Sequence, residues 1–135
     1  MFSPGLPLGG VALAKKDARR VAQRLGLPRL RAHVLVCTAG SCAPKARQKR
    51  ALKEARRAVR AQGLHRAPGR VVCSRVGCLG VCRDGPIAVV WPDGVFYRDA
   101  TPENLRRIVR EHLGEGRPVE ELCIARPDDE RDAAR

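Results

Sequence analysis

The sequence contains few aromatic side chains, since Phe, Tyr and Trp together make up 3% of its 135 positions. These residues are Phe2, Trp91, Phe96 and Tyr97. Proteins that hold single-stranded nucleic acid without sequence preference stack successive bases on several such rings. So small a set does not supply a stacking platform, and we therefore disfavour this class of function.

Membrane spans and several kinds of enzyme site are also missing. No run of about 18 apolar residues occurs, so we expect no transmembrane helix. The chain has no Cys-x-x-Cys, His-Glu-x-x-His, Walker loop or Ser/His/Asp set, which argues against a dithiol oxidoreductase, a zinc protease, a nucleotide hydrolase or a serine hydrolase. Residues 12–14 have the Ala-x-Ala form of a signal-peptidase site, but no Lys or Arg precedes them and Pro and Gly interrupt the apolar run. We therefore expect a cytoplasmic protein, in which clustered cysteines hold metal or carry out redox chemistry.

Positive charge is present in excess and is unevenly spread. The chain has 27 Lys and Arg against 14 Asp and Glu, a formal charge of +13. Residues 37–70 carry ten basic residues and one acid, whereas residues 71–135 carry ten basic and twelve acidic residues. The basic residues of one predicted helix are Lys45, Arg47, Lys49, Arg50, Lys53, Arg56, Arg57 and Arg60. Such a set is a solvated helix face, a docking surface for an acidic partner, or a site for nucleic-acid phosphate.

Hydrophobic periodicity predicts a small α/β protein. We expect helices over residues 15–25, 42–62 and 101–113, and strands over residues 32–37, 69–73, 87–91 and 95–97. Pro92-Asp93-Gly94 is typical of a hairpin turn, and Thr101 before Pro102 is typical of a helix start. In the charged segment that follows, only residues 119–124 suggest an element.

The order of these elements is β-α-β-β-β-α, which indicates a thioredoxin-like α/β fold with a mixed central sheet. We expect a flexible or helical N-terminal extension over residues 1–31 and one domain over residues 32–122. Residues 123–135 are expected to form a charged C-terminal tail.

Four of the six cysteines occur in two pairs. Cys37 and Cys42 form Cys-x4-Cys, and after 35 intervening residues Cys78 and Cys82 form Cys-x3-Cys. Each pair lies in a loop after a predicted strand, and a parallel β-α-β unit brings the two loops to the same edge of the sheet. Four thiolates there would repel one another without a cation. We therefore predict either an iron–sulfur cluster or a zinc ion.

Glycines accompany both pairs of cysteines. Because glycine has no Cβ, its backbone can approach sulfur closely and aim N–H groups at it, which stabilises negative charge there. The glycines expected to act in this way are Gly40, Gly77, Gly80 and Gly85.

The two loops resemble those of a known family. Residues 34–42, Val-Leu-Val-Cys-Thr-Ala-Gly-Ser-Cys, resemble the first half of the thioredoxin-like [2Fe-2S] ferredoxin motif. Residues 77–82, Gly-Cys-Leu-Gly-Val-Cys, followed by Gly85-Pro86, resemble the second half. The Pro-Asp-Gly turn, the Thr-Pro-Glu helix start and the Gly-Arg-Pro-Val run at 116–119 are similar as well. The resemblance covers residues 33–122, and a similar module occurs in the small iron–sulfur subunit of respiratory NADH dehydrogenase.

The resemblance implies a one-electron carrier rather than an enzyme. It implies that Cys37, Cys42, Cys78 and Cys82 hold a single [2Fe-2S] cluster, with one pair per iron. The carrier would deliver electrons to a redox partner, and the basic helix favours an acidic one. Freestanding members are commonly homodimers, which implies a homodimer here, and some accompany cobalamin-biosynthesis proteins, which allows a role in tetrapyrrole metabolism. We expect no membrane partner and disfavour nucleic acid.

The alternative interpretation is a four-cysteine zinc module that docks an acidic partner or nucleic acid, although x2 spacing dominates in structural zinc sites. Cys73 is separated from Cys78 by four residues and could compete as a ligand, but we expect an ordinary buried strand residue. Cys123 is expected to play no part in the site. We expect solvent-exposed or capping roles for His33, His65 and His112.

Overall fold

A five-stranded mixed sheet forms the centre of the fold. The computed structural model describes residues 17–66, 68–81 and 83–129. The strands are β1 (Ala32–Cys37), β2 (Val71–Val76), β3 (Ala88–Trp91), β4 (Val95–Tyr97) and β5 (Cys123–Ala125). They lie in the order β2-β1-β3-β4-β5, in which β1 and β2 are parallel and the other neighbours are antiparallel.

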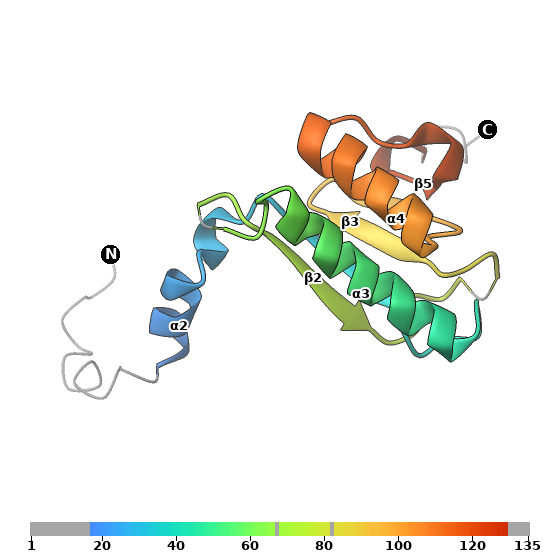
Figure 1. Cartoon of the computed structure of the whole chain (residues 1–135), viewed down its shortest axis with the longest axis horizontal. Coiled ribbons are helices and arrows are strands. Elements are labelled where there is room, and N and C mark those ends of the chain that lie inside the picture. The colour runs from blue at the N-terminus through green and yellow to red at the C-terminus, as the bar shows by residue number, and fades with distance from the viewer. Residues whose placement is uncertain (1–16, 67, 82, 130–135) are drawn as a thin grey trace.

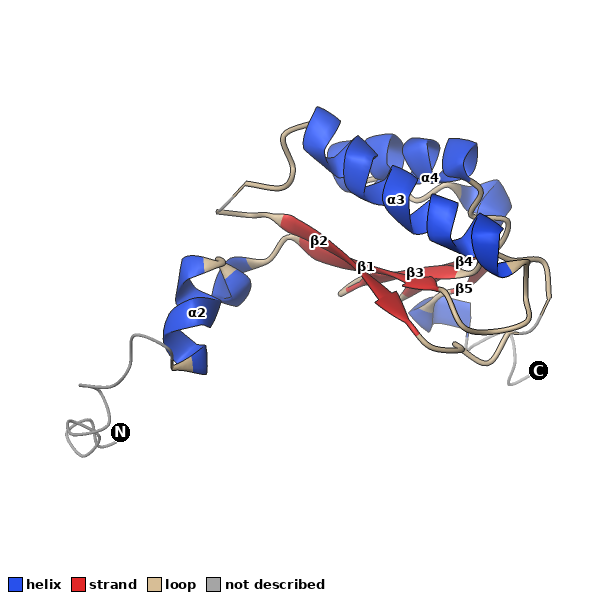
Figure 2. Ribbon diagram, turned by 60° about the horizontal axis from the view of Figure 1, so that its bottom comes forward, coloured by secondary structure: helices blue, strands red, loops and turns tan. Residues whose placement is uncertain are grey.

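Two helical segments pack side by side over one face of this sheet (Figure 2). One is α3 (Lys45–Ala61), and the other is α4 (Pro102–Ile108), which continues directly into the π-helix η3 (Val109–Gly114). The short helix α2 (Ala18–Arg24) stands away from the sheet at the N-terminal side and buries no residue (Figure 1). Three single turns complete the described structure: η2 (Leu27–Arg29), η4 (Glu120–Leu122) and η5 (Pro127–Asp129). Among the helices in the described ranges, none has the length and apolar character needed to cross a membrane.

Most predicted elements are present, with shifts at their ends. The strands predicted at residues 32–37 and 95–97 have the predicted bounds. β2 begins two residues later than predicted and continues to Val76, because its pairing with β1 extends over the whole length of β1. The strand Cys123–Ala125 falls at the start of the predicted tail, where it pairs with β4 and becomes an edge of the sheet.

Helix α3 packs against the sheet through a narrow face of small residues. Three of its buried positions are alanines, which have little side-chain volume and let the helix axis approach the strands closely. The buried positions recur every three or four residues, the spacing of one helix face. They are Gln48, Ala51, Leu52, Ala55, Ala58 and Val59.

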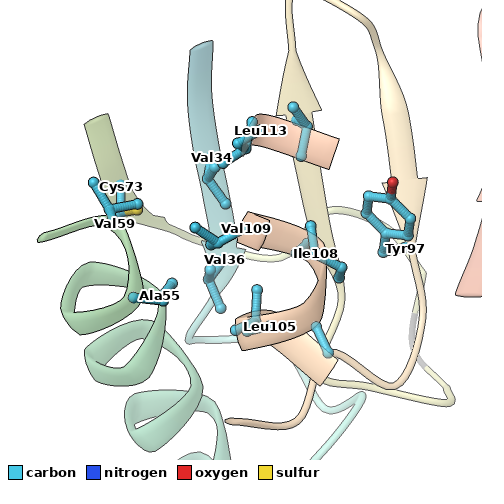
Figure 3. Packing of buried hydrophobic residues seen from close by; sticks show 14 of the residues in the cluster. Val34, Val36, Ala55, Val59, Cys73, Tyr97, Leu105, Ile108, Val109 and Leu113 are labelled. Carbon is cyan, nitrogen blue, oxygen red and sulfur yellow. The ribbon is translucent and has the colours of Figure 1, made fainter. Parts of the chain in front are cut away.

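The core lies between the sheet and the two helical segments (Figure 3). Val34 and Val36 of β1 belong to one cluster with Leu105 and Ile108 of α4, and all four side chains are fully buried. Cys73 of β2 also belongs to this cluster, packed near the α3 residues of Figure 3. The predicted burial of Cys73 in a strand is therefore confirmed, and that it is not a ligand stays a prediction.

The helix that closes the fold begins as predicted. The Thr101 hydroxyl accepts a hydrogen bond from the backbone N–H of Asn104 at 3.2 Å, and Pro102 occupies the first helical position. This cap satisfies one of the N–H groups that a helix start leaves without an intrahelical acceptor.

The expectation that His112 is exposed or caps a helix is wrong. His112 is only 3% exposed. Its Nδ1 forms a hydrogen bond with the Tyr97 hydroxyl and its Nε2 forms one with the Asp93 carboxylate, each at 2.7 Å. Both partners come from the β3–β4 hairpin, far from His112 in sequence. A pattern read along the helix alone does not reveal them.

Candidate metal centre

The parallel pairing of β1 and β2 brings both cysteine loops to one edge of the sheet. Cys37, the last residue of β1, lies opposite Val76, the last residue of β2. The next residue, Thr38, donates its backbone N–H to the Val76 carbonyl at 3.0 Å, so the two chains leave the sheet together. Cys42 then precedes α3, and Cys78 follows β2 by two residues.

Three of the four predicted ligands converge around Gly40. The sulfurs of Cys37 and Cys42 are 3.9 Å apart. A methyl group added at Gly40 would lie 3.1 Å from the Cys37 sulfur and 3.1 Å from the Cys78 sulfur. Cys37 and Cys42 are buried, whereas Cys78 is exposed at the surface. The fourth predicted ligand, Cys82, lies outside the described residues.

Gly85 holds the second loop against the first. Its backbone N–H donates to the Cys42 carbonyl at 3.0 Å. A Cβ at this position would lie 2.5 Å from the Cys42 sulfur, a distance that real Cβ atoms do not adopt. The sequence therefore has glycine here because only a bare backbone fits beside this cysteine.

The other two loop glycines differ from each other. Gly80 has φ +92°, a conformation that side chains disfavour, and its N–H donates to the Cys78 sulfur at 3.3 Å. At Gly77, an added Cβ would meet no atom within 4 Å. The close approach to sulfur expected of all four glycines is thus present at Gly40, Gly80 and Gly85, but nothing at Gly77 requires it.

The two buried thiols differ in their tendency to ionise. Burial raises the pKa of Cys37, but the backbone N–H groups of Ala39 and Gly40 point at its sulfur, and the net pKa lies below the ordinary value. Burial raises the pKa of Cys42, and the neighbouring Cys37 sulfur raises it further. A thiolate at Cys37 thus opposes a second one at Cys42 unless a cation compensates the charge.

Apolar side chains enclose the buried pair. Ile87, which is fully buried, packs with Cys37 and Cys42 in a small cluster separate from the main core. Leu79 and Val81, from the second cysteine loop, cover this cluster in part. Such surroundings exclude water from the sulfurs, which strengthens every electrostatic interaction they make.

Gln48 is a site residue that the sequence analysis missed. It lies among the basic residues of α3, but it is 0% exposed and its amide nitrogen is 2.9 Å from the Gly40 carbonyl and 3.4 Å from the Cys42 sulfur. The available signal was its position, three residues before Ala51 and four before Leu52 on the apolar face of the helix.

The remaining cysteines lie elsewhere. Cys73 points into the main core, where burial raises the pKa of its thiol to about 11. Cys123 belongs to the edge strand β5, and its thiol is 3.7 Å from the Ala125 carbonyl. Although Cys37, Cys42 and Cys78 lie near Gly40, they are not spaced as three ligands of a single metal ion, and no other three Cys, His, Asp or Glu side chains in the described ranges are grouped for one.

The donor set and the space around it fit an iron–sulfur cluster, because clustered thiolates at a loop edge with backbone N–H groups aimed at sulfur are its usual surroundings. A sequence model of the family described as "Thioredoxin-like [2Fe-2S] ferredoxin" matches residues 15–113, most of the chain. The chain belongs to the thioredoxin-like [2Fe-2S] ferredoxin family. The predictions of the fold and of the family's [2Fe-2S] cofactor are therefore confirmed, and ferredoxins are electron-transfer proteins.

Known ferredoxins resemble this one in sequence and in structure. The chain is 46% identical over 55 residues to "Ferredoxin, 2Fe-2S" of Aquifex aeolicus (strain VF5), covering 41% of this chain and 50% of that protein. It is 41% identical over 54 residues to "Ferredoxin, 2Fe-2S" of Clostridium pasteurianum, covering 40% of this chain and 53% of that protein. It thus spans about half the length of these curated relatives. A solved thioredoxin-like [2Fe-2S] ferredoxin from Aquifex aeolicus superposes with a TM-score of 0.64 at 32% identity, covering 71% of this chain and 92% of that one.

Proposed function

We propose that this ferredoxin carries single electrons on one [2Fe-2S] cluster held by Cys37, Cys42, Cys78 and Cys82. The observation that supports this ligand set best is the placement of Gly40, whose missing Cβ leaves room between the Cys37 and Cys78 sulfurs. These two cysteines belong to different loops, so this space lies between the two predicted pairs of ligands. The bound cluster supplies the redox chemistry, and the chain supplies thiolates, N–H donors and shielding from water.

Metal analysis of the purified protein tests this proposal. Protein prepared anaerobically should be red-brown, and each chain should contain about two iron ions and about two sulfide ions, the composition of one [2Fe-2S] cluster. A colourless protein with one zinc per chain would instead support the four-cysteine zinc module, which could dock an acidic partner or nucleic acid.

Single substitutions test the ligand set. Serine at any one of the four proposed ligand positions should shift the visible spectrum or abolish it, because an alkoxide is a harder ligand than a thiolate. Serine at Cys123 is the matched control and should leave the spectrum unchanged. An unchanged spectrum after substitution of a proposed ligand would remove that residue from the set.

We propose further that the redox partner is acidic and docks on the outer face of α3. All eight basic residues of this helix are exposed, and the helix begins three residues after Cys42, beside the cysteine loops. The one acid of the helix, Glu54, pairs with Arg57 of this face at 3.6 Å and with Arg106 of α4 at 3.0 Å, so it offsets at most one of the eight positive charges. A field of one sign near the electron-transfer site speeds encounter with a partner of the other sign.

Charge reversal tests the docking surface. Arg50→Glu with Lys53→Glu should slow electron transfer to an acidic acceptor protein at low salt and reduce the salt dependence of the rate. The matched control, Arg19→Glu with Arg20→Glu, makes the same charge change on α2, which stands away from the sheet. Equal rates for the two double variants would contradict docking on α3.

Three further parts of the interpretation stay predictions. We propose a homodimer, as the family resemblance implies, and sedimentation equilibrium measures it. We propose a reducing, cytoplasmic compartment, which suits the thiols of Cys37, Cys42 and Cys73, none of which forms a disulfide. A role in tetrapyrrole metabolism is a proposal that reconstitution with a cobalamin-pathway reductase would test.

A further inference from the structure

The Gln48 side chain is the buried polar contact between helix α3 and the cysteine loop. It is 0% exposed, although most residues next to it in sequence are exposed cations. Its amide nitrogen lies 2.9 Å from the Gly40 carbonyl oxygen and 3.4 Å from the Cys42 sulfur. One side chain thus reaches the turn of the loop and one of its thiols.

The chemistry of these two neighbours determines which way the amide points. The Gly40 carbonyl only accepts hydrogen bonds, so the group 2.9 Å from it must be the NH2 of Gln48 and not its oxygen. An NH2 group has two hydrogens, and the second is available for the Cys42 sulfur. The amide oxygen has no hydrogen-bond partner among the described residues, so the contacts of the NH2 group alone hold the amide in place.

We propose that Gln48 is a positioning residue that donates a hydrogen bond to the Cys42 thiolate and thereby raises the reduction potential of the cluster. This inference rests on the proposed ligand role of Cys42. The Gly40 bond keeps the amide fixed in front of the sulfur, and the sulfur receives the second N–H.

The direction of the effect follows from charge. Reduction adds negative charge to the cluster and its sulfur ligands, and an N–H donor stabilises the more negative state more strongly. A donor to the Cys42 sulfur therefore favours the reduced form, and the apolar surroundings of Ile87 strengthen the bond because water does not compete for it.

Backbone N–H groups also donate to these sulfurs, such as that of Gly40 to Cys37 at 3.4 Å. Side-chain substitutions do not remove backbone donors. At Gln48, by contrast, a substitution can delete the donor to the Cys42 sulfur while the backbone stays intact.

The first experiment is a potential measurement on cluster-loaded Gln48→Met, which has a similar shape and no N–H. Its reduction potential should lie below that of the wild type. The matched control is Gln62→Met at the exposed C-terminal end of the same helix, which should leave the potential unchanged. A Gln48→Met protein with the wild-type potential would overturn the proposal.

The second experiment takes its deciding result from the wild-type protein, and the variants only assign the signal. The reduced wild-type protein, labelled with 15N at its glutamine side chains, should show a 15N coupling to the electron spin in pulsed EPR. The chain contains three glutamines, at positions 23, 48 and 62. The coupling should persist in Gln62→Met and be lost in Gln48→Met, and its absence from the wild type would overturn the proposal.

Different results would contradict the proposed function and the proposed role of Gln48. A preparation without any [2Fe-2S] spectrum contradicts the proposed function itself. A normal [2Fe-2S] spectrum without the 15N coupling leaves the electron carrier intact and contradicts only the role of Gln48.

Discussion

At the scale of single residues, the hydroxyl of Tyr97 joins three segments of the chain. Tyr97 is fully buried, and its oxygen accepts the backbone N–H of Val119 at 3.0 Å. It also bonds Nδ1 of His112, whose Nε2 bonds the Asp93 carboxylate. In the neutral tautomer that satisfies every partner, Tyr97 donates to Nδ1 and Nε2 donates to Asp93. The chain of bonds ties the β3–β4 hairpin to η3 and to the segment after it.

Tyr97→Phe should therefore destabilise the protein without changing its cluster. The substitution leaves Val119 N–H and His112 Nδ1 without a partner in the core, at an expected cost of about 1–3 kcal/mol. Urea denaturation measures the free energy of unfolding. Asp93→Asn, at an exposed position whose amide oxygen still accepts from His112, should cost less. Equal losses in the two variants would contradict this account.

Cys73 gives a second prediction at this scale. Cys73→Val, which keeps an apolar side chain of similar size in the core, should leave the visible spectrum and the stability nearly unchanged. Cys73→Ser should also keep the spectrum but lower the free energy of unfolding, because it buries a hydroxyl among apolar groups. Loss of colour in either variant would show that Cys73 is a ligand.

The pH dependence of Cys73 follows from its burial. The pKa of the thiol is raised to about 11 from an ordinary value of 9.0, so folding favours the protonated form. This contribution to stability is fully present below pH 9 and is lost as the pH rises through 11. The unfolding free energy of the wild type should therefore fall more steeply above pH 9 than that of Cys73→Val, and parallel curves would contradict this.

At the scale of elements, the cysteine loops depend on glycine at particular places. Gly85→Ala should prevent cluster assembly, because the new Cβ would lie 2.5 Å from the Cys42 sulfur and 2.8 Å from the Cys42 carbonyl oxygen. Gly77→Ala is the matched control in the same loop, where an added Cβ meets no atom within 4 Å. Iron and sulfide content after expression distinguishes them. Equal loading of the two variants would contradict the close approach of the loops.

The elements also show how far sequence reasoning reaches. The strand 32–37 and the cap at Thr101 were predictable, because a local run of apolar residues and a local capping pattern specify them. In the charged C-terminal segment the sequence suggested only an element of unspecified type over residues 119–124, and the edge strand Cys123–Ala125 forms there through pairing with β4. The candidate site also has a predictable part and an unpredictable part. The spacing of its cysteines is visible in the sequence, whereas the burial of Gln48 depends on the packing of α3 against the sheet.

At the scale of the whole molecule, the N-terminal extension is nearly independent of the cluster domain. Its helix α2 buries no residue, and its described links to the domain include the bond from Arg70 to the Leu25 carbonyl at 3.0 Å and that from Arg31 N–H to the Arg70 carbonyl at 2.9 Å. Both links lie at the start of β2, at the opposite end of that strand from the cysteine loops.

A chain without residues 1–31 should therefore fold and hold its cluster. We expect the same visible spectrum and reduction potential as the full chain, because α2 stands away from the sheet and the bonds described above lie at the end of β2 that is far from the cysteine loops. Thermal unfolding followed at the visible band measures the stability of the truncated protein. Loss of the cluster on truncation would show that the extension belongs to the domain.

The sequence by itself determined the cysteine pairs, the order of the main strands and helices, and the family to which they point. These features depend on spacing along the chain, and the residues that carry them are neighbours in sequence. Only the tertiary structure decided which glycine must lack a Cβ, that His112 is buried, and that Gln48 faces the Cys42 sulfur. The glycine and histidine contacts join segments that are distant in sequence, whereas Gln48 is near Cys42 in the chain and is buried by the packing of α3 against the sheet. Such contacts exist only after the sheet and its helices have packed.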